Sequence, residues 1–286
     1  MSITRKEAEN IASVLSEGLP YIRKFQSKVI VVKYGGAAMT EEKLKKSFTR
    51  DIALMRLVGM QPVIIHGGGP QIGEELSKAG IKSEFINGLR VTTKSTMSVV
   101  KKVLGIKINT EIVRLIKRFG GNAISFNHKN YKIIKASKKY NEKGSDLGQV
   151  GKVDKILTGE LRKALRKGFI PVIAPIGKSD DGDFNINADE VAGEVAKSLK
   201  AEKLILLTDV RGIQDSENQL ISKITSKQGK KVLKEKFIKG GMTPKLMAAL
   251  EAKDAGVKSC HIIDGRVPHA VLLEVLTEEG VGTMIS

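Results

Sequence analysis

The chain has 286 residues, of which 41% are hydrophobic and only 4% aromatic, with no Trp. This length suffices for one large α/β domain or for two lobes that share a sheet, and the core must be aliphatic. A single cysteine, Cys260, excludes an intrachain disulfide and fits a reducing compartment. We find no apolar run of 18 residues and no secretory h-region, so we expect a cytoplasmic protein without a membrane span.

The formal net charge of +18 raises the question of a nucleic-acid partner. Residues 101–170 hold 18 Lys and Arg against 5 Asp and Glu, so most of the excess lies there. That segment has neither zinc-finger spacing nor an RNP-like aromatic pair. We therefore interpret it as a solvated basic surface, and expect neither a nucleic-acid nor a membrane partner. The interpretation covers Lys101, Lys102, Lys107, Lys117, Lys138 and Lys139.

Apolar residues recur at helical spacing over residues 4–19, and Pro20 disrupts the pattern, which predicts an amphipathic helix before the first strand. Four continuous apolar runs then alternate with helix-like segments; they are residues 28–36, 62–69, 170–177 and 203–212. Such runs are typical of parallel strands buried on both faces. We predict an α/β fold with an open, mostly parallel central sheet between helix layers.

Residues 120–155 have the pattern of short strands and turns, and we expect a hairpin-rich patch that covers one side of the site. Ligands in open parallel sheets bind beyond the carboxyl ends of the strands. Lys33, His66 and Asp209 follow or end three of the apolar runs. The site is therefore expected at this edge of the sheet.

Several familiar motifs are excluded, two of them by a single residue. Gly177–Ser179 matches the end of a P-loop, but position 172, where the motif needs glycine, is valine. A dinucleotide-binding G-x-G-x-x-G that starts at Gly67 fails because Ile72 stands at its last position. No Cys/His pair has zinc-ligand spacing and no G-x-S-x-G elbow occurs. The four histidines are scattered: His66, His128, His261 and His269.

Four segments remain that combine polar residues with a strand end or a helix start. They read "KYGG" (33–36), "HGGG" (66–69), "NINADEVAGEVA" (185–196) and "KGGMTPKLMAAL" (239–250). In the last, we predict Thr243 as the N-cap, Pro244 at the first helical position and Lys245 in the first turn.

A cation in the first turn, such as Lys245, opposes the helix dipole, and Lys33 is similarly out of pattern after an apolar strand. Both could be surface lysines whose ammonium groups reach solvent. Together with two glycine turns and Asp189, they instead favour phosphoryl transfer, which needs positioning and charge neutralisation.

With "NGLRVTTKSTM" (87–97) and "LLTDVRGI" (206–213), these segments resemble the amino acid kinase family in sequence and order. Within it they are similar to the branch that phosphorylates N-acetyl-L-glutamate. The resemblance extends from about residue 20 to the end of the chain. It implies the amino acid kinase fold, ATP with Mg²⁺, and conversion of the acetylglutamate γ-carboxylate to N-acetyl-L-glutamyl 5-phosphate, the second step of arginine biosynthesis.

The resemblance also implies residue roles. Lys33 and Lys245 would stabilise the transferring phosphoryl group, and Asp189 would hold both lysines. Acetylglutamate would contact Gly68, Gly69, Arg90 and Asn185, and the nucleotide would contact Gly35, Gly36, Thr208, Asp209 and Gly212. The planar fork of Arg90 suits a carboxylate. The acceptor carboxylate is already ionised at neutral pH, so no general base is required and His66 is expected to be structural. No protein metal site is expected.

The two ends of the chain resemble the arginine-sensitive, hexameric branch of the family. Residues 1–27 would then form an oligomerisation segment that links dimers into a homohexamer, a trimer of dimers. Residues 28–187 would form an acetylglutamate-binding N-lobe, and residues 188–286 a C-lobe that binds ATP and arginine. His269 and Glu279 are the candidate regulatory residues.

Some relatives bind a nitrogen-signalling protein, which adds a candidate partner. Two alternatives stay open. One is a kinase for another amino acid carboxylate, and the other is a basic nucleic-acid-binding or regulatory protein on a kinase scaffold.

Overall fold

The computed structural model describes residues 16–86, 88–140, 146–277 and 280–286, together with residues 4, 6 and 9. Within these ranges, eight strands form the central sheet: β1 (Val29–Tyr34), β2 (Gln61–His66), β5 (Ala123–Phe126), β8 (Ile170–Ile173), β11 (Lys203–Thr208), β12 (Lys223–Ile224), β13 (Ser259–Asp264) and β14 (Gly282–Ile285). Their order is β12-β14-β13-β11-β1-β2-β8-β5. Neighbouring strands are parallel except β13 and β14, which confirms the predicted mostly parallel sheet.

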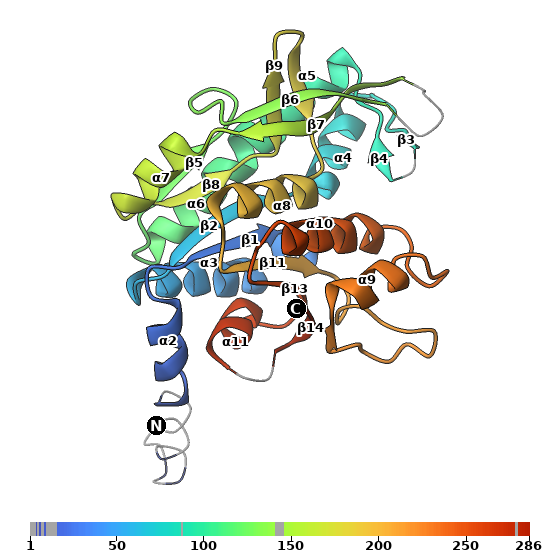
Figure 1. Cartoon of the computed structure of the whole chain (residues 1–286). Coiled ribbons are helices and arrows are strands. Elements are labelled where there is room, and N and C mark those ends of the chain that lie inside the picture. Colours follow the sequence, from blue (N-terminus) through green and yellow to red (C-terminus); the bar gives the residue numbers. More distant parts are fainter. Residues whose placement is uncertain are drawn as a thin grey trace.

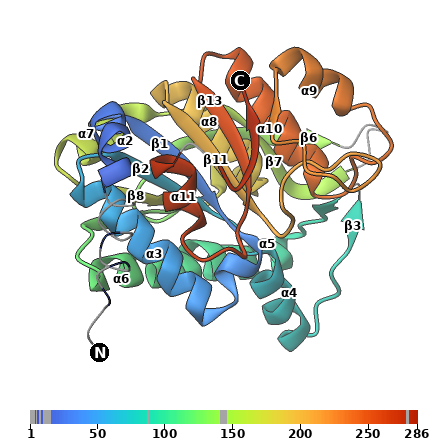
Figure 2. The same cartoon turned by 90° about the horizontal axis from the view of Figure 1, so that it is seen from below.

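A layer of helices covers each face of this sheet, as Figure 1 and Figure 2 show. One layer consists of α3 (Glu42–Leu57), α4 (Gly69–Lys78), α5 (Lys94–Lys102), α6 (Asn109–Arg118) and α11 (Ala270–Leu276). The other consists of α7 (Thr158–Arg166), α8 (Ala188–Leu199) and α10 (Met242–Asp254), with α9 (Ser226–Val232) beside α10. The sheet runs through both predicted lobes, because β1 lies next to β11.

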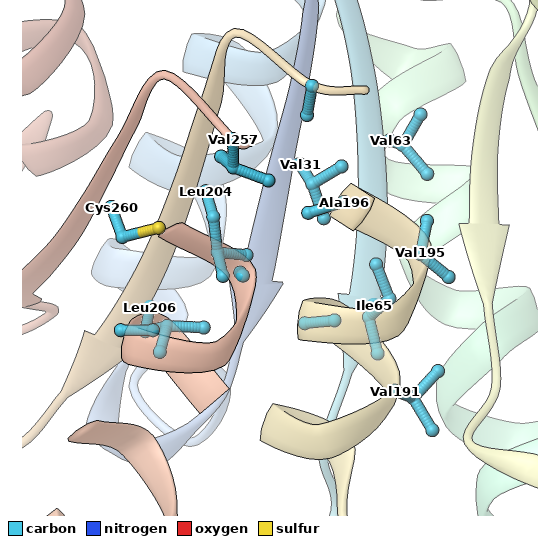
Figure 3. Packing of buried hydrophobic residues seen from close by; sticks show 14 of the residues in the cluster. Val31, Val63, Ile65, Val191, Val195, Ala196, Leu204, Leu206, Val257 and Cys260 are labelled. Atoms are coloured by element: carbon cyan, nitrogen blue, oxygen red, sulfur yellow. The ribbon is translucent and has the colours of Figure 1, made fainter. Parts of the chain in front are cut away.

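Alternate residues of each central strand face opposite helix layers. Val31, Ile65 and Val191 of α8 belong to one buried cluster (Figure 3), whereas Ile30 belongs to the cluster on the other face. All these side chains are fully buried. Burying one such side chain contributes about 1.5–3 kcal/mol. Burial on both faces explains why the strands appear in the sequence as continuous apolar runs rather than alternating ones.

A second, smaller sheet of described strands packs on α8 in the upper part of Figure 1. It closes as a barrel of β6 (Ile134–Tyr140), β7 (Asp146–Ile156), β9 (Ile176–Ser179) and β10 (Gly182–Asn185). The expectation of a hairpin patch over residues 120–155 is correct for β6 and β7. It is wrong for β5, which lies at the edge of the central sheet, parallel to β8. A four-residue apolar run does not indicate which of two sheets it will join.

The Lys-rich surface contains many local ion pairs. Lys101 lies 3.1 Å from Asp183, and Lys139 lies 2.9 Å from Glu190. Similar pairs join Lys107 to Glu75 and Lys138 to Asp146. These contacts agree with the interpretation of a solvated surface.

Most of the predicted N-terminal helix, residues 4–19, lies outside the described residues. The helix that follows is α2 (Leu19–Phe25), at the periphery of the molecule in Figure 1. Pro20 lies in the first turn of α2 and does not simply end the preceding helical pattern. A proline is tolerated there because the N–H that it lacks would have no helical partner. Phe25 is buried and anchors α2. Among the described residues, no helix is both long and apolar enough to span a membrane.

Candidate functional site

The register of the central sheet brings the sequence-predicted polar residues to its carboxyl edge. Tyr34 at the end of β1 lies beside His66 at the end of β2, and Lys33 lies beside Leu206 of β11. The side chain of Lys33 is therefore presented close to both glycine turns. This agrees with the expected position of the site.

One buried carboxylate holds the two lysines together. Lys33 Nζ lies 3.2 Å from Asp189 Oδ1, and Lys245 Nζ lies 3.1 Å from Asp189 Oδ2. Lys33 and Asp189 are only 7% and 4% exposed. Asn187 caps α8, its Oδ1 accepting from the N–H groups of Asp189 and Glu190 at 2.8 and 3.2 Å. The cap fixes Asp189 in the first turn, where a carboxylate also suits the helix dipole.

The charges of this group set its protonation. Burial alone would raise the pKa of Asp189, but the charges of Lys33 and Lys245 outweigh it and hold that pKa below its ordinary value. Burial lowers the pKa of Lys33, Lys245 adds to the effect, and Asp189 opposes it. With both ammonium groups protonated, two cations share one carboxylate. The excess positive charge is available to an anion in the adjoining cavity.

Helix α10 begins earlier than predicted. It starts at Met242 with Gly241 as its N-cap, so Thr243 is not the cap and Pro244 is not the first helical residue. Gly240, with φ +59°, turns the chain into the helix, and the N–H of Met242 donates to the carbonyl of residue 239. Lys245 is still in the first turn, and the anion that it meets is Asp189.

A cavity of about 380 Å³ opens beside these charged groups. Most of the site residues implied by the resemblance line it: Lys33, Gly35, Gly36, Gly68, Gly69, Arg90, Asn185, Asp189 and Asp209. Its wall also contains Phe85, Leu104 and Val150, which the sequence analysis did not identify. These apolar residues come from three distant segments, and no spacing pattern connects them.

The residues predicted to bind the acceptor are held by contacts within the protein. Arg90 ends β4 (Leu89–Arg90), which pairs with β3 (Phe85–Ile86). Its guanidinium donates to the Gly69 carbonyl at 3.0 Å and to the Ser83 hydroxyl, and lies 4.5 Å from the centre of the Phe85 ring. The Asn185 side chain donates to the Thr92 hydroxyl at 3.2 Å.

The nucleotide-side candidates separate into two groups. Asp209 Oδ1 accepts a hydrogen bond from the Ala37 N–H at 2.6 Å, in the short 3₁₀ helix η1 (Gly36–Met39), and so lies against the first glycine turn. Thr208 pairs with Asp264 at the end of β11, and Gly212 is buried against Thr283. Neither Thr208 nor Gly212 is among the residues that line the cavity.

A comparison of the sequence with models of protein families identifies the family of this chain. Residues 28–264 match the model of the amino acid kinase family. The chain belongs to this family. The matched range contains Lys33, Asp189 and Lys245 as well as both glycine turns.

This amino acid kinase has close relatives in sequence and structure. It is 51% identical to the acetylglutamate kinase of Hydrogenovibrio crunogenus, with all of this chain and 99% of that protein covered. Its structure is similar to N-acetylglutamate synthase from Neisseria gonorrhoeae, in complex with coenzyme A and N-acetyl-glutamate, at a TM-score of 0.86 and 25% identity. That match covers 96% of this chain, which spans only 63% of the synthase. A structure of smu.665 from Streptococcus mutans matches at a TM-score of 0.77 and 32% identity, covering 90% and 98% of the two chains.

Of the two regulatory candidates in this amino acid kinase, the structure describes His269, which is not among the residues that line the cavity. Glu279 lies outside the described residues. The N–H of His269 donates to the Ser47 hydroxyl at 2.6 Å, and its Nδ1 lies 2.6 Å from Asp51 Oδ1. His269 thus joins the start of α11 to α3. Its regulatory role stays a prediction.

The burial of Asp51 predicts a pH-dependent stability. Burial raises the pKa of Asp51 to about 6, and the bond to His269 opposes the rise. A folded-state pKa above the ordinary value means that the folded protein favours the protonated acid. The contribution of Asp51 to the free energy of unfolding is therefore complete below pH about 4 and is lost as the pH rises through about 6. Asp51→Asn should remove that loss. The free energy of unfolding of the variant should therefore increase by about 1–3 kcal/mol relative to that of the wild type when the pH is raised from 4.5 to 7.5.

Urea unfolding of both proteins at the two pH values measures this effect. Asp180→Asn, at an exposed aspartate, is the matched control and should keep the wild-type dependence. The same pH dependence in the Asp51→Asn and wild-type proteins would show that Asp51 does not titrate as stated.

Proposed function

We propose that this amino acid kinase transfers the γ-phosphoryl group of ATP to the γ-carboxylate of N-acetyl-L-glutamate, forming N-acetyl-L-glutamyl 5-phosphate in arginine biosynthesis. The observation that carries the proposal is the pair of lysines on Asp189, placed beside a cavity that also contains Arg90 and two glycine turns. The 51% identity to an acetylglutamate kinase over the full chain supports this choice of acceptor.

The chemistry requires charge stabilisation more than proton transfer. An acceptor oxygen bonds to the γ-phosphorus while the bond from that phosphorus to the bridging oxygen of ADP breaks, giving an acyl phosphate and ADP. The acceptor carboxylate has an ordinary pKa of about 4.3, so it attacks without a general base. Lys33 and Lys245 would stabilise the negative charge on the oxygens of the transferring group, in positions that Asp189 fixes beforehand.

The two glycine turns divide the substrates between them. Gly35 and Gly36 follow Lys33, and we assign their N–H groups to the γ-phosphate. Gly68 and Gly69 begin α4, where the first N–H groups of a helix have no helical partner. We assign these to acetylglutamate, with Arg90 on its α-carboxylate and Asn185 on the same molecule.

Thr208, Asp209 and Gly212 are assigned to the nucleotide side. Mg²⁺ would enter with ATP and neutralise phosphate charge, held mainly by phosphate oxygens and water.

A substrate panel tests the proposal. Purified protein is incubated with ATP, Mg²⁺ and hydroxylamine, which converts an acyl phosphate to a hydroxamate, in the presence of acetylglutamate, glutamate or aspartate. Hydroxamate is expected with acetylglutamate alone. Turnover of another amino acid would support the in-family alternative, and salt-sensitive DNA binding without turnover would support the nucleic-acid alternative.

Arg90→Ala should mainly weaken acceptor binding. Removing one partner of a desolvated, hydrogen-bonded charge pair costs about 2 kcal/mol or more, so the KM for acetylglutamate should rise about 30-fold or more while the KM for ATP stays unchanged. Arg90→Lys keeps the charge but not the planar fork, so its KM for acetylglutamate should lie between those of the wild type and Arg90→Ala. Steady-state kinetics measures both constants. An unaltered KM for acetylglutamate in the alanine variant would refute the assignment.

We further propose that arginine inhibits the enzyme and that residues 1–27 link dimers into a hexamer. The sequence resemblance of both chain ends to the arginine-sensitive branch supports this. Repeating the assay with arginine, and light scattering with and without residues 1–27, tests the two parts. The lobe boundary at residues 187 and 188, a cytoplasmic location and a nitrogen-signalling partner stay predictions.

A further inference from the structure

The proposed mechanism leaves His66 without a chemical task, yet its surroundings define its ring completely. His66 is fully buried at the end of β2, and its Nδ1 lies 2.9 Å from the Gly67 carbonyl oxygen. A carbonyl only accepts, so Nδ1 carries the proton. Nε2 lies 3.2 Å from Asn109 Nδ2 and must accept from it.

The orientation of the Asn109 amide is fixed independently of His66. Its Nδ2 also donates to the Val172 carbonyl at 2.9 Å, and its Oδ1 accepts from the Ser125 hydroxyl. One amide group thus joins β2, β5 and β8 beneath the glycine turn. Because all of its groups are satisfied, the ring of His66 is held as one neutral tautomer. Burial lowers the pKa of His66 to about 4, which keeps the ring neutral at physiological pH.

A turn of π-helix packs on the same glycine segment from another side. The turn, η2 (Val103–Ile108), comes directly before Asn109. A Cβ atom on Gly68 would lie 2.5 Å from methyl groups of both Leu104 and Ile108, and Gly68 has φ +159°. The π-helical turn therefore contacts the turn residue itself, while Asn109 reaches the histidine that precedes it. π-helical turns often occur at functional sites.

We propose that His66 and Asn109 are positioning residues that set the orientation of the Gly67–Gly68 peptide, so that the N–H of Gly68, one of the two N–H groups assigned to the acceptor, faces it. The inference rests on the proposed function, since it assigns those N–H groups to acetylglutamate. A peptide carbonyl that accepts from His66 fixes the opposite direction of the N–H of the same peptide unit, which belongs to Gly68. The network therefore acts on the acceptor through the backbone and touches neither substrate.

The tautomer is tested first, on the unmodified chain. The sequence contains only four histidines, so solid-state ¹⁵N NMR of histidine-labelled protein at pH 8 resolves few signals. The signal that disappears in His66→Gln is assigned to His66. A neutral ring protonated at Nδ1 is expected. Protonation at Nε2, or a charged ring, would overturn the proposal, whether or not the protein phosphorylates acetylglutamate.

Kinetics of His66→Phe then tests the effect on the acceptor. Because misplacement of a substrate by about 1 Å can cost about 100-fold in rate, kcat/KM for acetylglutamate should fall about 10- to 100-fold. The KM for ATP should stay within about twofold of the wild type, since the altered groups lie on the acceptor side. His261→Phe, at a buried histidine of β13, is the matched control and should leave the acceptor KM unchanged. Equal effects of His66→Phe on both substrates, or none, would overturn the proposal.

A charge change at Asn109 gives a readout that a merely structural role would not produce. In Asn109→Asp the carboxylate cannot donate, so Nε2 must be protonated, and the nearby charge raises the pKa of His66. The doubly protonated ring at pH 6 still donates to Gly67, whereas the neutral ring at pH 8 gives its one proton to the carboxylate.

The ratio of variant to wild-type kcat/KM for acetylglutamate should therefore fall from pH 6 to pH 8. Asn122→Asp, at an exposed position before β5, should give a ratio that does not depend on pH. A pH-independent ratio in Asn109→Asp would contradict the proposal. If Asn109→Asp does not fold, the NMR measurement of the His66 tautomer in the wild type still tests the proposal. Turnover of acetylglutamate by the wild type tests the proposed function separately.

Discussion

Replacing Lys33 by Met is expected to lower kcat for phosphoryl transfer from ATP to acetylglutamate by about 10²- to 10³-fold, the loss seen when one preorganised donor to a developing charge is removed. Methionine keeps much of the length and apolar volume of lysine but not its charge. The Lys33 ammonium lies 3.2 Å from Asp189 Oδ1 and lines the cavity. Without it, Lys245 alone would face the oxygens of the transferring phosphoryl group. Lys245→Met should give a loss of similar size.

Lys203→Met is the matched control. Lys203 begins β11, the strand next to β1, and its register partner is Ile30. It is thus a partly buried lysine of the same sheet, but at the opposite edge from Lys33. Its loss should leave kcat in the absence of arginine unchanged. Hydroxamate formation under saturating substrates measures all three variants, and wild-type turnover in both Lys33→Met and Lys245→Met would refute the mechanism.

The general architecture of the site could be predicted because it depends on local pattern. Continuous apolar runs determine buried parallel strands, and parallel strands place their carboxyl ends at one edge. The positions of Lys33 and His66 at this edge follow from that rule alone, as does the position of Asp209 beside the first glycine turn. Asn187 and Asp189 at a helix start follow from capping chemistry.

Features that depend on tertiary context could not be predicted in the same way. The pairing of Lys245 with Asp189 joins residues that are 56 positions apart, so no spacing rule connects them, and only the family resemblance implied it. The start of α10 depends on the backbone conformations of two consecutive glycines, which allow several starting points. The contacts of Asn109 could not be predicted from the sequence for the same reason, because its three partners come from three separate strands.

Asp189→Asn should combine a loss of stability with a changed pH profile. The substitution leaves Lys33 and Lys245 close together without their counter-charge. Breaking a buried ion pair by removing one partner costs about 3–5 kcal/mol, so urea unfolding at pH 7 should show a loss in this range. The wild-type pKa of Asp189 lies below its ordinary value, so this contribution is present above pH about 4 and is lost below it. The two proteins should therefore converge in stability as the pH falls below about 4.

The catalytic effect of Asp189→Asn follows from the groups that act on Lys33. Asp189 is the group that raises the pKa of Lys33 against burial and the charge of Lys245. Its removal lowers that pKa further, so Lys33 loses its proton, and the enzyme its activity, at a lower pH. We expect kcat to decline at a lower alkaline pH in Asp189→Asn than in the wild type.

Asp183→Asn is the matched control for this profile. Asp183 is also shared by two lysines, Lys101 at 3.1 Å and Lys178 at 3.5 Å, but on the surface. Both of those lysines are partly exposed, so solvent screens the pairs and the substitution should alter stability by less than about 1 kcal/mol. The kcat–pH profile should keep its wild-type alkaline limb. If Asp183→Asn and Asp189→Asn shift that limb equally, the effect is one of general surface charge, and Asp189 does not set the protonation of Lys33.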